Sequence, residues 1–306
     1  MENFDLNDTD FCWKYRVYEI FQKEQHIEEF SGLLYHYTSL EGFIGILSNQ
    51  NIWATEYSFL NDSSELGYGL SIVKKLLKKY IDENNDALVC KFFEYVLNYL
   101  NDEALIHQFF IASFSEHKDQ LSQWKGYGRN GSGVSLGFDF KDLTRWKREE
   151  ILDINIYIKP VIYEKEIQEK EITKILDLLM KHIKTLKTID KIETIASCLA
   201  GFLIEKSIFF KSLAFQEENE WRIVYNNIGT SSVPRKDVKF RIVDSKILPY
   251  LELRLVAEKA KLPINEIVYG AKNNFDNLRK VLQHIFSNFD NPTKLPSLVG
   301  SNIPLQ

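Results

Sequence analysis

Near the start of the chain, the spacing of apolar residues changes from that of a strand to that of a helix. Residues 33–38 are mostly apolar and end in a polar triplet, a pattern that predicts a short strand. Beyond it, apolar side chains recur three and four positions apart, which places them on one face of a helix. These positions are Leu40, Phe43, Ile44 and Leu47. Thr38 and Glu41 have the spacing of a capping box, which predicts that the helix begins here.

The same two patterns alternate along the rest of the chain. Short apolar or alternating runs predict strands, and helical spacing predicts helices. Predicted strands cover 51–55, 108–115, 134–138, 151–164, 220–225, 238–243, 250–255 and 265–270. Predicted helices cover 10–30, 62–80, 87–100, 121–124 and 274–287, and the tail at 295–304 is expected to be extended. Pro160 indicates that its strand lies at a sheet edge or contains a bulge.

A strongly helical stretch with interleaved lysine and glutamate runs from about 166 to 210. It contains no proline and lies between two predicted strands, so we expect two or three inserted helices with solvated charged faces. The chain shows neither an internal repeat nor a low-complexity linker. The sequence therefore predicts an α+β fold with a mixed, mainly antiparallel sheet and flanking helices. We expect a single domain over 1–306, with the helical insertion inside it.

Composition narrows the class of protein. A hydrophobic content of 44% over 306 residues is enough for a large core and excludes wholesale disorder. Acidic and basic residues are well mixed at a net charge of −5, which argues against sequence-independent binding of nucleic acid across a broad face. The acidic N-terminus lacks an apolar run, so no signal peptide or membrane anchor is expected. Three widely spaced cysteines fit a reduced, cytoplasmic protein.

The sequence lacks the residue patterns that several kinds of functional site require. The six histidines show no metal-ligand spacing, so no metal site is predicted. No Gly-x-Ser-x-Gly is present for a serine hydrolase, and no compact acidic motif for a nuclease. Four glycines between 126 and 133 stand in helix–loop–strand order, which does not fit a phosphate-binding loop. They form either a tight turn or a backbone that approaches a ligand closely.

Two residues are candidates for chemistry. His36 stands at a predicted strand end beside a helix N-terminus, where free N–H groups favour an anionic ligand. Glu220 lies in a strand with Arg222 on the same face, and such a carboxylate can stabilise developing positive charge. Purely structural roles stay open for both: a satisfied imidazole for the first, and an ion pair with Arg222 for the second. Tyr57 and Phe59 form either an aromatic wall or part of the core.

Several blocks, in their order along the chain, resemble the bacterial domain-of-unknown-function 2971 family. They are Tyr35–Thr38, Phe59–Glu65, Phe114–Ser115 with Asp119 and Trp124, Gly133–Phe138, Phe215–Arg222 and Ser301–Pro304. The similarity extends over most of 33–304, and the order of the blocks is more specific than any single block. The family name implies no activity.

A second resemblance, to the start of the ADP-ribosyltransferase-like fold, does imply one. It rests on His36–Thr38, Ile46–Leu47 and Ile52–Tyr57, and it implies a split sheet. By this resemblance NAD is the substrate, and His36 and Glu220 are catalytic. His36 bonds a ribose hydroxyl, and Glu220 bonds the nicotinamide ribose 2′-OH and stabilises an oxocarbenium-like transition state.

The remaining NAD contacts come from the same resemblance. The cofactor-binding set is His36, Tyr37, Thr38 and Tyr57. The backbone around Tyr37 holds the nicotinamide amide, and Tyr57 stacks on the nicotinamide ring, with Phe59 as the alternative. The chain departs from the pattern at Asn51, where the fold usually has a small residue.

The resemblance therefore implies an NAD-dependent ADP-ribosyltransferase or NAD glycohydrolase. It would transfer ADP-ribose to a protein or nucleic-acid acceptor, or hydrolyse NAD, as a toxin or antiviral-defence effector; this context is an analogy. The alternative is a non-catalytic sensor module that binds a nucleotide or protein in the same cleft. The enzyme requires that His36 and Glu220 line one cleft, within about 10 Å of each other, because both must reach one substrate.

Overall fold

A computed structural model describes residues 30–60, 63–102, 109–144, 156–183, 192–226, 237–243, 245–254, 263–287 and 296–305. The strands are β1 (Leu33–Thr38), β2 (Ile52–Glu56), β3 (Phe109–Ser115), β4 (Val134–Asp139), β5 (Ile156–Pro160), β6 (Glu220–Asn226), β7 (Lys239–Val243), β8 (Lys246–Leu253), β9 (Ile264–Tyr269) and β10 (Ser297–Gly300). The helices are α2 (Leu40–Asn49), α3 (Ser63–Asp82), α4 (Ala87–Tyr99), α6 (Leu121–Gly126), α7 (Phe140–Leu143), α9 (Lys165–Ile183), α10 (Ile192–Ser207) and α11 (Phe275–Ser287). Short 3-10 turns are η1 (Tyr57–Phe59), η2 (Arg129–Gly131) and η3 (Leu213–Glu218).

The strands join one sheet in the order β10-β9-β4-β1-β3-β2-β8-β7, and β6 with β5 pairs beside β3. Only the β9–β10 pairing of these strands is parallel, so the predicted mixed, mainly antiparallel α+β fold is confirmed. Pro160 ends β5, which among the described strands pairs with β6 alone and lies at an edge, one of the two alternatives that Pro160 indicated. The predicted helix at 10–30 and the start of the strand predicted at 151–164 fall outside the described residues, except for Phe30.

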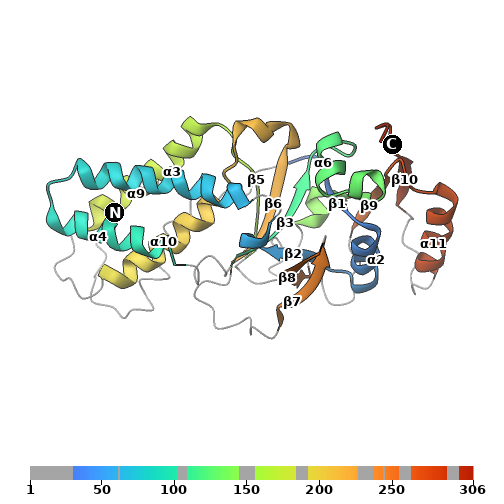
Figure 1. Cartoon of the computed structure of the whole chain (residues 1–306), viewed down its shortest axis with the longest axis horizontal. Coiled ribbons are helices and arrows are strands. Elements are labelled where there is room, and N and C mark those ends of the chain that lie inside the picture. Colours follow the sequence, from blue (N-terminus) through green and yellow to red (C-terminus); the bar gives the residue numbers. More distant parts are fainter. Residues whose placement is uncertain are drawn as a thin grey trace.

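The sheet divides at β3. Strand β6 pairs along one edge of β3 over its full length, so β1 and β2 must share the other edge. β1 contacts that edge at Tyr35↔Ser115, and β2 contacts it at Thr55↔Ile111 and Glu56↔Phe110. Between these contacts lie Ala112 to Phe114, where no described strand pairs with this edge. Two arms, β1-β4-β9-β10 and β2-β8-β7, therefore diverge from β3 (Figure 1).

The two larger of three hydrophobic cores in the described chain cover opposite faces of this sheet. Helices α3, α4, α9 and α10 form a layer at one end of the molecule (Figure 1) and pack on Phe109 and Ile111 of β3. Phe110 and Ala112 point to the opposite face, as alternation along a strand requires, and join a second core with α2 and α11. Helices α9 and α10 lie between β5 and β6, in the stretch where inserted helices were expected.

Helix α2 begins one residue later than the sequence predicted. Ser39 is its N-cap: the backbone there is extended, and the Ser39 hydroxyl accepts a hydrogen bond from the Gly42 N–H at 3.1 Å. Thr38 remains the last residue of β1, so the capping box predicted from Thr38 and Glu41 is wrong. Thr38 and Ser39 both carry a hydroxyl that can cap a helix, and the end of β1 at Thr38 leaves Ser39 as the cap.

The buried face of α2 also differs from the predicted stripe. Phe43, Ile46 and Leu47 are buried, whereas Leu40 and Ile44 are 36% and 41% exposed. Both sets have helical spacing, so periodicity alone does not distinguish them. The second core selects the first set, because those three side chains face the sheet.

The glycine-rich loop packs against the end of β1. A Cβ atom at Gly133 would lie 2.2 Å from the Thr38 carbonyl oxygen and 3.0 Å from that of Gly128. Gly131 has a φ of +83°, in the region that favours glycine. The backbone that Gly133 approaches closely therefore belongs to this chain.

In the described parts of the chain, every helix is too short or too polar to span a bilayer.

We expect Gly133→Ala to lower the free energy of unfolding by about 1–3 kcal/mol, because the added methyl group must displace backbone. Gly126→Ala is the matched control in the same segment, since a Cβ there meets nothing within 4 Å. It should change stability by less than about 1 kcal/mol. Urea denaturation of both variants measures the difference, and equal effects would contradict the packing described for Gly133.

Candidate functional site

A pocket of about 1010 Å³ lies where the two arms of the sheet diverge. One wall comes from β1 and the start of α2, the opposite wall from β2, β7 and β8, and the floor from Ile111 to Ser113 of β3. Segment α6–η2 closes a further side. Pockets for small ligands commonly measure about 300–1000 Å³, so this volume suits a large ligand such as a dinucleotide.

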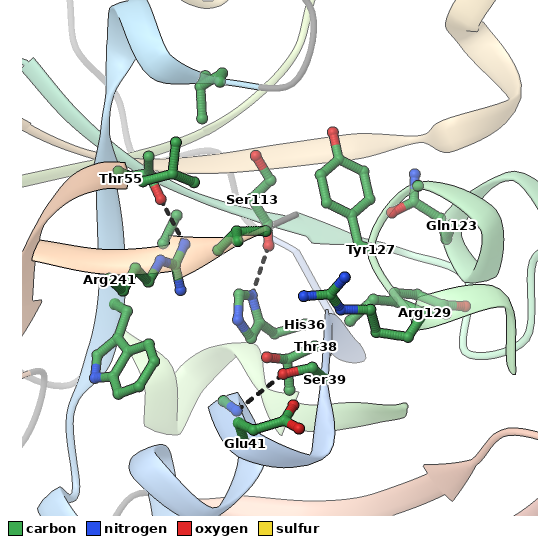
Figure 2. A pocket seen from close by; sticks show the side chains of 18 of the residues that line it. His36, Thr38, Ser39, Glu41, Thr55, Ser113, Gln123, Tyr127, Arg129 and Arg241 are labelled. Atoms are coloured by element: carbon green, nitrogen blue, oxygen red, sulfur yellow. Dashed lines mark hydrogen bonds between the residues drawn. The ribbon is translucent and has the colours of Figure 1, made fainter. Parts of the chain in front are cut away.

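His36 stands at the base of this pocket. Its Nδ1 lies 2.9 Å from the Ser113 carbonyl oxygen, and because a carbonyl only accepts, Nδ1 carries the proton. Ser113 belongs to the part of β3 where no described strand pairs with its edge. The imidazole therefore supplies a donor to this carbonyl between β1 and β2. Its Nε2 is left as an acceptor, and the ring borders the pocket (Figure 2).

The charge state of His36 follows from its surroundings. Burial lowers the pKa of the imidazole to about 4, and the nearby positive charge of Arg241 acts in the same direction. The hydrogen bond with Ser113 opposes these effects without outweighing them. At neutral pH the side chain is uncharged, so it offers a ligand a lone pair and not a positive charge.

Two arginines flank His36 from opposite sides. Arg129 comes from η2 and Arg241 from β7, and their guanidinium groups point toward the middle of the pocket (Figure 2). Glu41, in the first turn of α2, also borders the pocket. The Ser39 hydroxyl is the main cause of its lowered pKa, and Arg129 contributes. The pocket thus combines positive charge with the N-terminus of α2, where anions are favoured.

Aromatic side chains form part of the pocket wall. Phe59, Trp53 and Tyr127 border it, and Phe59 is 42% exposed. Tyr57 is 2% exposed and belongs to the helical core, so it does not line the pocket. Of the two aromatics that the sequence left open for stacking, the structure therefore brings Phe59 to the pocket and not Tyr57.

Tyr37 and Thr38 border the pocket beside His36. The Tyr37 phenol packs edge-to-face on Trp124 at 5.0 Å and donates to the His117 carbonyl at 2.7 Å. Its side chain is thus committed to the opposite face of β1, as strand alternation from His36 requires. Beyond Tyr35, the edge of β1 that faces β3 is unpaired in the described chain, so backbone groups here lie beside the pocket.

Glu220 does not line the pocket, so the structure does not bring it to one cleft with His36. The residue is 3% exposed and lies at the start of β6. Its carboxylate bonds Arg222 Nε at 2.7 Å and Nη2 at 2.9 Å, and Lys211 Nζ at 3.1 Å. The ion pair with Arg222, one of the two roles expected from the sequence, is present and is buried.

Ser113 stands between the two candidate residues. Its carbonyl binds His36, while its hydroxyl points the other way (Figure 2) and hydrogen-bonds Glu220. Burial alone would raise the pKa of Glu220, but Arg222 and Lys211 outweigh burial and hold it well below its usual range. The Glu220 carboxylate is therefore ionised, and Arg222 and Lys211 balance its charge. Ser113 lines the pocket in front of it, whereas Glu220 does not.

Sequence reasoning missed Arg129, Ser113 and Arg241. Arg241 lies in a strand that was predicted, but no local pattern places it beside His36, about 200 residues earlier. Ser113 acts through its backbone carbonyl, which side-chain motifs do not reveal. Among the described residues, no three His, Cys, Asp or Glu side chains gather closely enough to hold a metal ion.

Asp119 joins two of the blocks that carry the family resemblance, its own block with Trp124 and the C-terminal block Ser301–Pro304. Its Oδ1 accepts from Trp124 Nε1 and from the Ser301 hydroxyl, each at 2.6 Å, and its Oδ2 accepts from the Asn302 N–H at 2.7 Å. The carboxylate therefore ties the C-terminal segment to α6, whose C-terminal end borders the pocket. A role in connecting segments of the fold therefore explains this part of the family pattern.

Comparison with protein families gives one match. Residues 123–223 match the family described as "Protein of unknown function (DUF2971)". The matched segment begins in α6 and ends in β6, and over these residues it confirms the resemblance to that family; the blocks at 35–38, 59–65, 114–119 and 301–304 lie outside it. No curated protein and no solved structure matches the chain.

We expect Glu220→Gln to lower the free energy of unfolding by about 3–5 kcal/mol, because it leaves Arg222 and Lys211 with a weakened counter-charge in the interior. Glu83→Gln is the matched control: its ion pair with Lys79 is more than 60% exposed on both sides. That variant should lose only a few tenths of a kcal/mol. Chemical denaturation checks both, and a Glu220→Gln protein as stable as the control would contradict the buried ion pair.

His36 should make stability depend on pH in a defined window. Between about pH 6.5 and 4 the unfolded chain binds a proton at this residue that the folded chain does not bind, so the protein loses stability as the pH falls. Above pH 6.5 the contribution is constant. His36→Asn should flatten this part of the profile, because an asparagine amide keeps a donor near Ser113 and does not titrate. Denaturation midpoints measured across the window test this, and an unchanged slope would refute the lowered pKa.

Proposed function

We propose that this chain, which carries a DUF2971 segment at residues 123–223, is an ADP-ribosyltransferase-like enzyme that uses NAD. It breaks the bond between nicotinamide and ribose and transfers ADP-ribose to a protein or nucleic-acid acceptor, or to water. The observation that carries the proposal is that β1 and β2 separate along one edge of β3. A large pocket lies between them, and a neutral His36 stands at its base. We place this activity in the cytoplasm, and a toxin or phage-defence role follows by analogy only.

His36 supports NAD as the ligand through its hydrogen-bonding pattern. The Ser113 carbonyl holds the proton on Nδ1, so Nε2 can accept a hydrogen bond from a hydroxyl group. A ribose hydroxyl is such a donor. The pKa of about 4 keeps this acceptor available throughout the physiological pH range. Phe59 supplies the exposed ring on which nicotinamide would stack, and the backbone beside Tyr37 would hold its amide.

Glu220 is the residue on which catalysis depends in this proposal. Reaching a ribose hydroxyl would require its carboxylate to exchange contacts with Ser113, Arg222 and Lys211 for contacts with the substrate. The same ion pairs favour a second candidate function, a non-catalytic module that binds a nucleotide or a protein partner in the pocket. The two functions differ in NAD turnover and agree on binding.

The test compares the wild-type protein with His36→Asn and, as a matched control, His284→Asn, an exposed histidine on α11. Nicotinamide release is followed by chromatography, and NAD affinity by calorimetry. We expect wild type and control to bind NAD and release nicotinamide. His36→Asn should stay folded and bind about three- to tenfold more weakly, because one hydrogen bond to the ligand is lost.

The outcomes separate the two functions. NAD binding without nicotinamide release, with candidate acceptors present, would reject the enzyme and support the sensor module. Neither binding nor release in a folded wild-type protein would reject NAD as the ligand. Equal affinities for His36→Asn and the control would remove His36 from the binding site.

A further inference from the structure

Arg241 has an unusual environment for a guanidinium group. It lies over the rings of Trp53 and Tyr250, with its Cζ 5.4 and 5.6 Å from the ring centroids. Its Nη2 donates to the Thr55 hydroxyl at 2.7 Å. These contacts hold the planar group at the wall formed by β2, β7 and β8, with its other terminal nitrogen on the side of His36 (Figure 2).

Among the described residues no carboxylate pairs with Arg241, and none of them bonds its buried Nε. Burial also lowers the pKa of this guanidinium, so the site disfavours the charge it carries. Arg241 is itself only partly buried, whereas Arg222 and Lys211, the fully buried cations of the described chain, are both paired with Glu220, and Lys211 also with Glu218. A buried charge without a counter-charge is unfavourable, and a bound anion would compensate it.

We propose that Arg241 is the anion anchor of the pocket and binds a phosphate group of the ligand. The planar guanidinium presents paired N–H donors that match two phosphate oxygens, and its orientation is set by Trp53, Tyr250 and Thr55 before the ligand arrives. The N-terminus of α2 lies across the pocket, but Glu41 stands in its first turn. Of the two walls, the one at Arg241 is therefore better suited to an anion.

The position of His36 narrows the class of ligand further. Its Nε2 accepts hydrogen bonds, whereas the adjacent Arg241 only donates them. A ligand that satisfies both carries a hydroxyl close to a phosphate, as a ribose phosphate does. This inference rests on the proposed use of NAD for the identity of the nucleotide, and the anchor itself is tested by simpler phosphates.

The experiment measures the affinities of ADP-ribose, inorganic pyrophosphate and adenosine by calorimetry at low and moderate salt. Wild type is compared with Arg241→Gln and with Arg241→Lys, which keeps the charge and loses the planar fork. Lys239→Gln is the matched control, because Lys239 is an exposed cation on the same strand that pairs with Glu252 and does not line the pocket. Melting temperatures establish that each variant is folded.

We expect Arg241→Gln to weaken ADP-ribose and pyrophosphate binding about 10- to 100-fold and to leave adenosine unaffected. Arg241→Lys should lose less, so it tests the anchor even where the glutamine variant is unstable. Lys239→Gln should match wild type. Phosphate binding that depends on Arg241 supports the anchor even without NAD turnover, which would reject only the proposed enzyme. Equal affinities for wild type and both Arg241 variants, or no phosphate binding by wild type, would overturn the anchor.

Discussion

The structure around the pocket depends on one backbone carbonyl. On β3, Ser113 lies between Ile111, which pairs with β2, and Ser115, which pairs with β1. Its carbonyl therefore lacks a partner from a described neighbouring strand. Buried carbonyl groups are nearly always paired, and here His36 supplies the donor. That bond allows the sheet to divide and fixes which nitrogen of His36 faces the pocket. The pocket and its polar base therefore both depend on the bond between Ser113 and His36.

Charge is distributed unevenly around this division. On one side of β3, the Glu220 carboxylate is compensated by Arg222 and Lys211 in a buried cluster that holds β6 in place. On the other side, Arg241 is oriented by two aromatic rings and one hydroxyl, with no described carboxylate beside it. The first arrangement is typical of a structural ion pair and the second of a binding site. The pocket therefore favours an anionic ligand, whereas the glutamate expected to act on it is engaged elsewhere.

The elements were largely predictable because helical and strand periods are local properties of the sequence. His36 could also be identified, since a polar residue that ends an apolar strand stands out. Other features depend on contacts between distant segments. Thr38 and Ser39 both carry a hydroxyl that can cap the helix, and only the end of β1 selects Ser39. In the same way, only the helical core shows that Tyr57, and not Phe59, is buried. The pairing of Glu220 with Arg222 is visible at a spacing of two residues, but Lys211 and Arg241 reach their places only through the topology of the sheet.

His36 is a neutral hydrogen-bond acceptor that Ser113 holds at the base of the pocket, where we propose that it contacts the ligand. Nitrogen-15 NMR of the histidine side chains measures this state of His36, because the two ring nitrogens report tautomer, protonation and ligand contact separately. We expect a proton on Nδ1 of His36, a pKa of about 4, and a shift of the Nε2 resonance when NAD is added. A proton on Nε2, a pKa near the ordinary value of 6.5, or no response to saturating NAD would contradict it.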